Sequence, residues 1–198
     1  MDGFSEITLD GILDNAYDIS PSVYQYYKGL GERRIVINGE LEDDIVEKIV
    51  LPLIEMDNDG TGEPIDIILS SPGGSVLDTM VLCDIIDRIK TQTTITVMGY
   101  AYSMASLILM AGYNNPNVKK VCYPFSTALL HAGSSYIEGA ANIVKDTFHF
   151  TEKLENLIKR YILTHSKITE DEYNAMERYE WYMLSDDMLR LGLVDEVL

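Results

Sequence analysis

The sequence predicts one α/β domain built on a mainly parallel sheet. Segments with the apolar spacing of strands alternate along the chain with segments of helical spacing. The length of 198 residues suits one domain, and no linker rich in Pro, Gly or Ser divides it. Parallel strands need crossover connections, and these are right-handed. We therefore expect the helices to stack in layers against the sheet.

The predicted elements follow one another from residue 34. Short apolar runs predict strands at 34–38, 65–69, 94–98, 120–122, 128–130 and 193–197. Apolar residues three or four positions apart predict helices at 42–54, 76–90, 104–111, 140–164, 170–179 and 186–191. The strand at 65–69 is apolar enough to be buried on both faces, and the helix at 104–111 to be buried all round. We expect a turn at 99–103 and a mobile or partner-ordered acidic tail at 1–21, ahead of a single domain at 22–198.

The charge balance excludes several classes of partner. Asp and Glu number 32 against 15 Lys and Arg, which gives a net charge of −17. A polyanion is repelled by phosphate backbones and by anionic lipid, so we expect neither nucleic-acid nor membrane binding. No apolar run approaches the roughly 20 residues that span a bilayer, and the N-terminal residues lack the features of a signal peptide. We expect a soluble cytoplasmic protein.

The sequence gives no sign of a metal ion or a cofactor. Cys83 and Cys122 lie 39 residues apart, which matches no metal-ligand spacing, and both are expected to be buried free thiols. The stretch from Asp57 to Gly62 opens like a calcium-binding loop, but Ile68 occupies the twelfth position, where a bidentate Glu is required. We therefore expect a solvated turn there.

Two junctions between a strand and a helix have the residue types of a catalytic site. Gly73 and Gly74 leave backbone N–H groups accessible at a helix start, which suits an oxyanion, although a tight turn needs such glycines as well. Ser103 follows the 94–98 strand and precedes the most apolar helix, where a nucleophile or a helix cap are both consistent with the sequence. Its surroundings do not match the G-x-S-x-G pattern of α/β-hydrolases.

A serine nucleophile needs a base that accepts its proton and an acid that orients the base. His131 ends the 128–130 strand and is the candidate base, whereas His149 and His165 lie on or beside the long helix and look structural or solvated. Spacing alone leaves five candidate acids, which are Asp171, Glu177, Glu180, Asp186 and Asp187.

These motifs, taken in order, resemble the proteolytic subunit of the caseinolytic (Clp) protease, a self-compartmentalising serine peptidase. The strand followed by S-P-G-G matches residues 67–74, and the nucleophile segment matches GYAYSMAS at 99–106. A strand, a histidine and a later long helix match residues 129–164. A C-terminal pattern ending in Gly-Leu-Val-Asp matches residues 179–195, and the similarity covers about residues 22–198.

The resemblance implies roles for five residues. Ser103 would be the nucleophile, His131 the general base and Glu180 the acid, with the backbone N–H groups of Gly74 and Met104 as the oxyanion hole. The chain departs from the family pattern at two places: Tyr179-Glu180 replaces the usual Arg-Asp pair, and Tyr102 replaces an alanine before the nucleophile. The loop at 113–120 is also a few residues longer than usual.

The resemblance further implies a spiral of β-β-α units, shared with crotonases, and a long protruding handle helix at about 140–164. It implies stacked heptameric rings, most simply a tetradecamer, that degrade unfolded polypeptides delivered by an AAA+ unfoldase ATPase. Two alternatives stay open at this point. One is a catalytically weakened structural or regulatory subunit in a mixed ring, and the other is a crotonase-type acyl-CoA enzyme.

Overall fold

The computed structural model describes residues 20–133, 137–176 and 178–198. The helical segments are α2 (Pro21–Gly31), the π-helix η1 (Val46–Val50), α3 (Leu51–Asn58), α4 (Val76–Ile86), α5 (Met104–Met110), α6 (Ala141–Thr164), α7 (Glu170–Met176) and α8 (Ser185–Arg190). The strands are β1 (Arg34–Ile37), β2 (Ile65–Ser71), β3 (Thr93–Tyr102), β4 (Val118–Cys122), β5 (Thr127–Leu130), β6 (Trp181–Leu184) and β7 (Glu196–Val197). Residues 1–19, which make up most of the expected tail, lie outside the described residues, and so does the candidate acid Glu177.

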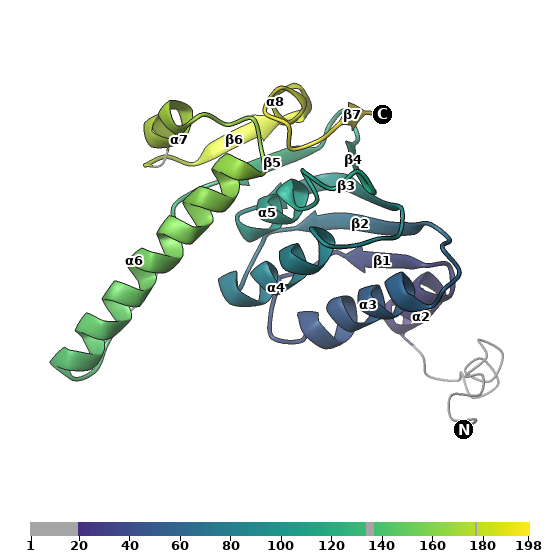
Figure 1. Cartoon of the computed structure of the whole chain (residues 1–198), viewed down its shortest axis with the longest axis horizontal. Helices are drawn as coiled ribbons and strands as arrows, with labels where there is room; N and C mark the ends of the chain where they lie inside the picture. Colours follow the sequence, from purple (N-terminus) through teal and green to yellow (C-terminus); the bar gives the residue numbers. More distant parts are fainter. Residues whose placement is uncertain (1–19, 134–136, 177) are drawn as a thin grey trace.

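The strands form a mixed sheet in which parallel pairs dominate, as the sequence predicts. The order β1-β2-β3-β4-β7 is parallel throughout, while β5 pairs with β3 and β6 pairs with β5. Only the β5–β6 pair is antiparallel among the described residues. Figure 1 shows α3, α4 and α5 side by side against this sheet, with α6 projecting away from it.

Strand β3 changes its partner half-way along its length. Its first half, from Thr93 to Val97, pairs with β4, and its second half, from Tyr100 to Tyr102, pairs with β5. Gly99 lies between the two halves with φ +94°, a conformation that glycine adopts without steric cost. The expected turn at 99–103 is therefore wrong: the chain stays extended through Tyr102, the last residue of the strand, and turns only at Ser103.

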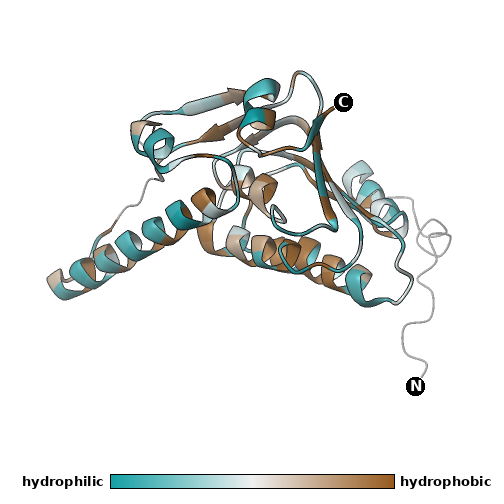
Figure 2. Cartoon of the chain, turned by 45° about the horizontal axis from the view of Figure 1, so that its top comes forward, coloured by the Kyte–Doolittle hydropathy of each residue, from teal (hydrophilic) through white to brown (hydrophobic). Residues whose placement is uncertain are grey.

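The core lies between the central strands and the helices packed on them. All seven residues of α5 are buried, as predicted from its composition. In β2, Ile65, Ile67 and Leu69 are fully buried, but the residues between them are only half-buried. The expectation that this strand is buried on both faces is wrong within one chain. Figure 2 shows apolar residues concentrated in the strands and in the helices beside them.

The two cysteines belong to this core. Cys83 and Cys122 are free and buried, as expected. Burial raises the pKa of both thiols, which keeps them protonated and unreactive.

The helix predicted at 42–54 contains a proline, and the fold accommodates it with a π turn. Pro52 has no N–H, so an α-helix would leave the carbonyl of Lys48 without its donor. The π turn ends just before the proline, and there the N–H of Leu51 reaches back five residues to Val46 O. The hydroxyl of Tyr26 donates to Lys48 O at 3.2 Å and so takes the place of the missing N–H. Helix α2, which supplies Tyr26, was not predicted.

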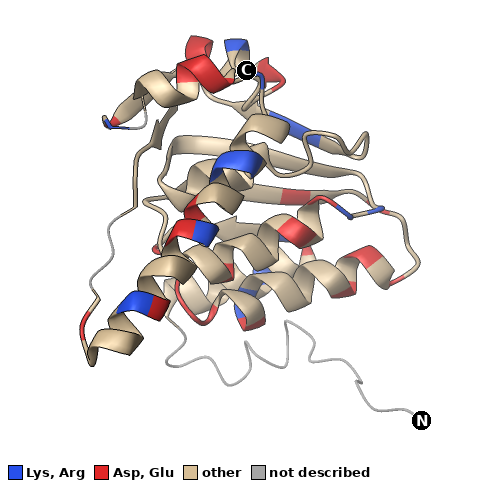
Figure 3. Ribbon diagram, turned by 60° about the vertical axis from the view of Figure 1, so that its left-hand side comes forward, with Lys and Arg blue, Asp and Glu red and all other residues tan. Residues whose placement is uncertain are grey.

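Helix α6 matches the predicted range within one residue and leaves the body over most of its length (Figure 1). Ile143, Phe148, Phe150 and Leu157 are exposed, although side chains of this kind are usually buried. Basic and acidic residues are interspersed along the same helix (Figure 3). Among the described residues, no helix is both long enough and apolar enough to cross a membrane.

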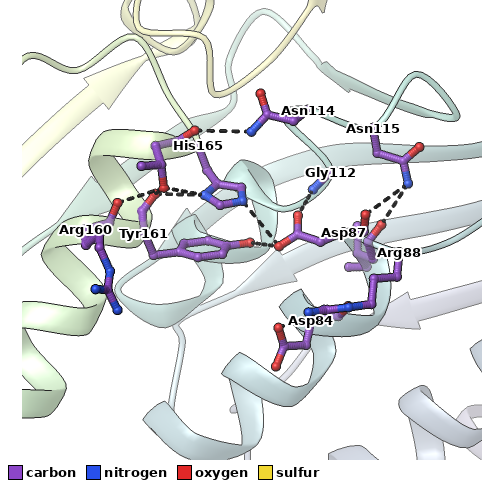
Figure 4. Close-up of polar contacts among 11 residues, drawn as sticks. Asp84, Asp87, Arg88, Gly112, Asn114, Asn115, Arg160, Tyr161 and His165 are labelled. Atoms are coloured by element: carbon purple, nitrogen blue, oxygen red, sulfur yellow. Dashed lines mark hydrogen bonds and ion pairs between the residues drawn. The ribbon is translucent and has the colours of Figure 1, made fainter.

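A polar network around Asp87 fastens the base of α6 to the body (Figure 4). One carboxylate oxygen accepts from the N–H of Gly112 at 2.6 Å, and the other accepts from the hydroxyl of Tyr161 at 3.0 Å. His165 stacks on Tyr161 at 3.9 Å between ring centroids, and its Nε2 lies 3.4 Å from Asp87 Oδ2. His165 is therefore structural, as the sequence suggested.

This network predicts a stability role for Asp87 that is separate from any chemistry. Asp87→Asn keeps the shape but removes the charge and one acceptor, leaving partly buried donors unpaired. We expect a loss of about 1–3 kcal/mol in the free energy of unfolding, seen as a melting temperature lower by several degrees. Asp84 lies on the exposed side of α4, the helix that ends at the cap residue Asp87, so Asp84→Asn is the matched control and should melt like the wild type. Equal melting of both variants would contradict the role given to the network.

Candidate active site

Ser103 occupies a strained turn between β3 and α5. Its φ and ψ are +53° and −125°, a combination that costs a non-glycine residue free energy and occurs mainly at functional sites. Its N–H donates to Leu129 O at 2.8 Å, which fixes the turn against β5. Its side chain makes no capping hydrogen bond to α5. The alternative of a simple helix cap is therefore wrong.

The register of the sheet brings the candidate base to this serine. Strand β5 ends at Leu130 beside the end of β3, with Leu129 opposite Tyr102, so His131 emerges next to Ser103. The Nε2 atom of His131 lies 2.8 Å from Ser103 Oγ.

The candidate acid arrives from the opposite direction. In the antiparallel β5–β6 pair, Leu130 lies opposite Trp181, so the residue after one strand faces the residue before the other. These two residues are His131 and Glu180, and Nδ1 of His131 lies 3.1 Å from Oε1 of Glu180. A carboxylate only accepts, so Nδ1 carries the proton and Nε2 is free to accept from the serine hydroxyl.

Asp187 and His149 make their contacts away from His131. Asp187 accepts from the backbone of Leu184 and pairs with Arg190, which assigns it to the start of α8. His149 is exposed on α6 and pairs with Glu152. Of the acids that spacing left open, Glu180 is the one whose contact with His131 is seen in the described part of the chain.

The glycine turn lies directly against the serine. Gly73 has φ +94°, and a Cβ built on it would lie 2.6 Å from Tyr102 O, 2.8 Å from Ser103 Cβ and 2.9 Å from Met104 N. A Cβ built on Gly74, whose φ is +155°, would lie 2.2 Å from Leu41 O, and Gly74 forms a parallel bridge with Leu41. Gly74 and Met104 line the same cleft as Ser103.

A cleft of about 460 Å³ opens at Ser103 and His131. Its lining is mainly apolar and is shared by the glycine turn, α5, α6, α7 and the start of β6: Glu40, Pro72, Gly73, Gly74, Val76, Ser103, Met104, Leu107, Leu130, His131, Ala132, Gly133, Glu155, Ile158, Ile162, Tyr173, Met176 and Trp181. A concave, mostly apolar space with a few convergent polar groups is typical of a substrate site.

Sequence reasoning missed several residues of this site. Strand β6 was not predicted, so Trp181 and Tyr182 were not assigned to the site. Tyr182 donates to Glu180 Oε2 at 3.3 Å and packs on Tyr102. The four-residue apolar and aromatic run Trp181–Leu184 is the signal from which this strand could have been predicted.

A hydroxyl, an imidazole and a carboxylate in consecutive contact, beside a glycine turn, are the parts of a hydrolase that acts on acyl groups. The comparison with known families agrees with this class: a family model described as Clp protease matches residues 19–198. The chain belongs to the Clp protease family and corresponds to its proteolytic subunit. The α/β fold predicted from the sequence is the fold of this family.

The close approach of Gly73 predicts a sharp effect of a single methyl group. Gly73→Ala would force the turn away from Ser103 and Met104, and positive φ adds a further cost for alanine. We expect peptide hydrolysis to fall at least about 100-fold, since misplacing catalytic groups by 1 Å has effects of this size. Gly39→Ala is the matched control, because nothing lies within 4 Å of its Cβ position. Gly73→Ala protein with wild-type hydrolysis would contradict this description of the turn.

Proposed function

We propose that the chain is the serine endopeptidase subunit of a self-compartmentalising protease, with Ser103, His131 and Glu180 as its catalytic triad. The observation that carries the proposal is the continuous contact from Ser103 Oγ to His131 Nε2 and from His131 Nδ1 to Glu180. Because the chain belongs to a family of peptidases, we infer that the bond it cleaves is a peptide bond.

In the proposed reaction, Ser103 Oγ attacks the carbonyl carbon of the peptide bond while its proton passes to His131 Nε2. Glu180 stabilises the resulting imidazolium through the Nδ1–H hydrogen bond. The N–H groups of Gly74 and Met104 receive the oxyanion of the tetrahedral intermediate. His131 then protonates the leaving amine, and a water molecule, deprotonated by the same imidazole, releases the acyl group from Ser103.

Glutamate at the acid position reaches the imidazole. The alternative of a weakened structural subunit required a carboxylate too far from His131, and the 3.1 Å contact favours an active site instead. Membership of the Clp protease family favours peptide substrates over the acyl-CoA thioesters of crotonases.

The charge of Glu180 supplies a direct test. Glu180→Gln keeps the size of the side chain but removes the charge that stabilises the imidazolium, so we expect kcat to fall by roughly 10³–10⁴-fold. Fluorogenic peptide hydrolysis measures the effect, and Asp186→Asn, a rival acid from the sequence, is the control that should retain activity. Near wild-type activity of Glu180→Gln would show that Ser103 and His131 work without this acid.

The proposal includes the assembly and partners of the family. Stacked heptameric rings would enclose the active sites in a cytoplasmic tetradecamer, and an AAA+ unfoldase ATPase would deliver unfolded polypeptides to them. In a single chain the apolar side chains of α6 are exposed to water. Their exposure supports an assembly in which further copies of the chain bury them.

The face of α6 that carries these side chains predicts the assembly state. Phe150 and Leu157 are seven residues apart and exposed on one face of the helix. Replacing both by Asp should convert the assembled protein to smaller species in sedimentation velocity. Ala141→Asp adds a charge to an exposed position on the opposite side of the same helix and should leave the assembly intact. A double variant that sediments like the wild type would exclude α6 from the contact between rings.

A further inference from the structure

Both oxygens of the Glu180 carboxylate have a partner. Oε1 faces Nδ1 of His131 at 3.1 Å, and Oε2 accepts a hydrogen bond from the hydroxyl of Tyr182 at 3.3 Å. The carboxylate therefore bridges the imidazole and a phenol, with one oxygen for each.

Burial does not hold Glu180 in this position. Its side chain is 55% exposed, and a glutamate has three rotatable bonds, which allow many orientations in water. A hydrogen bond on the oxygen that His131 does not use restricts the rotation of the carboxylate about its last bond. Tyr182, the second residue of β6, provides this restriction two positions after Glu180.

The ring of Tyr182 is itself braced by the strand that carries the nucleophile. It packs edge-to-face on Tyr102, with 6.0 Å between ring centroids and an interplanar angle of 85°. The Tyr102 hydroxyl lies 3.0 Å from Thr127 Oγ1, and the Thr127 hydroxyl in turn donates to Gly99 O at 3.4 Å. The chain of contacts thus runs across β3, β5 and β6, the three strands whose ends adjoin Ser103, His131 and Glu180.

The electrostatics of the pair keep Tyr182 a donor. The negative charge of Glu180 raises the pKa of the Tyr182 phenol above its ordinary value, so the hydroxyl keeps its proton at neutral pH. The ring is also exposed, so its removal leaves no cavity in the core.

We propose that Tyr182 is a positioning residue for the hydrolysis described above. Its hydroxyl holds the Glu180 carboxylate in the orientation that receives the His131 Nδ1–H, and Tyr102 holds the ring of Tyr182. The inference rests on the proposed function, because it assigns a role in the same reaction. Tyr182 itself touches neither the substrate nor the reacting atoms.

The test is the hydrolysis of a fluorogenic peptide by the full-length, assembled protein. Tyr182→Phe removes one oxygen atom, and we expect kcat to fall about 3- to 10-fold, the range that a single hydrogen bond supplies. KM should stay within about twofold of the wild-type value, because no binding contact changes. Tyr179→Phe, which removes the same atom from another exposed ring beside Glu180, is the matched control and should leave kcat unchanged.

A double-mutant cycle separates positioning from a general structural effect. In a Glu180→Ala background the hydroxyl has no carboxylate to hold, so adding Tyr182→Phe should cause no further loss of kcat. Two results would overturn this role of Tyr182 and leave the proposed function standing. One is the same loss of kcat on adding Tyr182→Phe in both backgrounds, and the other is a Tyr182→Phe variant with the full activity of a wild type that hydrolyses peptides. Wild-type protein that hydrolyses no peptide would instead overturn the proposed function and, with it, this role.

Discussion

The position of strand β5 is the constraint on which the site depends. It is parallel to the end of β3 on one side and antiparallel to β6 on the other. The first pairing places His131 beside Ser103, and the second places Glu180 beside His131. Because successive side chains of a strand point to opposite faces, a slip of one residue in either pairing would turn His131 away from its partners.

The nucleophile turn stores strain that the surrounding structure holds in place. Ser103 keeps its positive φ because its N–H is bound to Leu129 O and because α5 behind it is buried on every side. Ser106, one turn further on, has its hydroxyl 2.7 Å from both Ala101 O and Leu129 O. This buried serine therefore ties the turn to β5, and its burial excludes it as a rival nucleophile.

The sequence predicted the elements whose apolar pattern is strong. The buried helix at 104–110 and the strands β1, β2 and β5 lie close to their predicted ranges, because burial on a sheet dictates their composition. The long helix at 141–164 was predicted from its helical spacing, although most of it lies outside the core. Helix α2 and strand β6 were missed. Both are short or half-exposed, and tertiary contacts such as that of Tyr26 with Lys48 O hold them in place. The partner change of β3 at Gly99 depends on long-range pairing, which no local pattern contains.

In the site, too, residues placed by a local pattern were predicted and residues placed by long-range pairing were not. Chain order placed Ser103 and His131 at strand ends, where parallel sheets concentrate function. The acid could not be chosen from spacing, because its position depends on an antiparallel pairing with a strand that the pattern did not predict. Tyr182 was out of reach for the same reason. Its hydrogen bond to Glu180 exists only once β6 lies beside β5.

If the contacts among Ser103, His131 and Glu180 make one serine nucleophilic, that serine reacts with a fluorophosphonate, which modifies activated serines. Intact-mass analysis of the treated protein should then show one adduct per chain, mapped to Ser103 by peptide sequencing, and none in Ser103→Ala protein. An unmodified wild-type chain, or an adduct on another serine, would contradict the role given to Ser103.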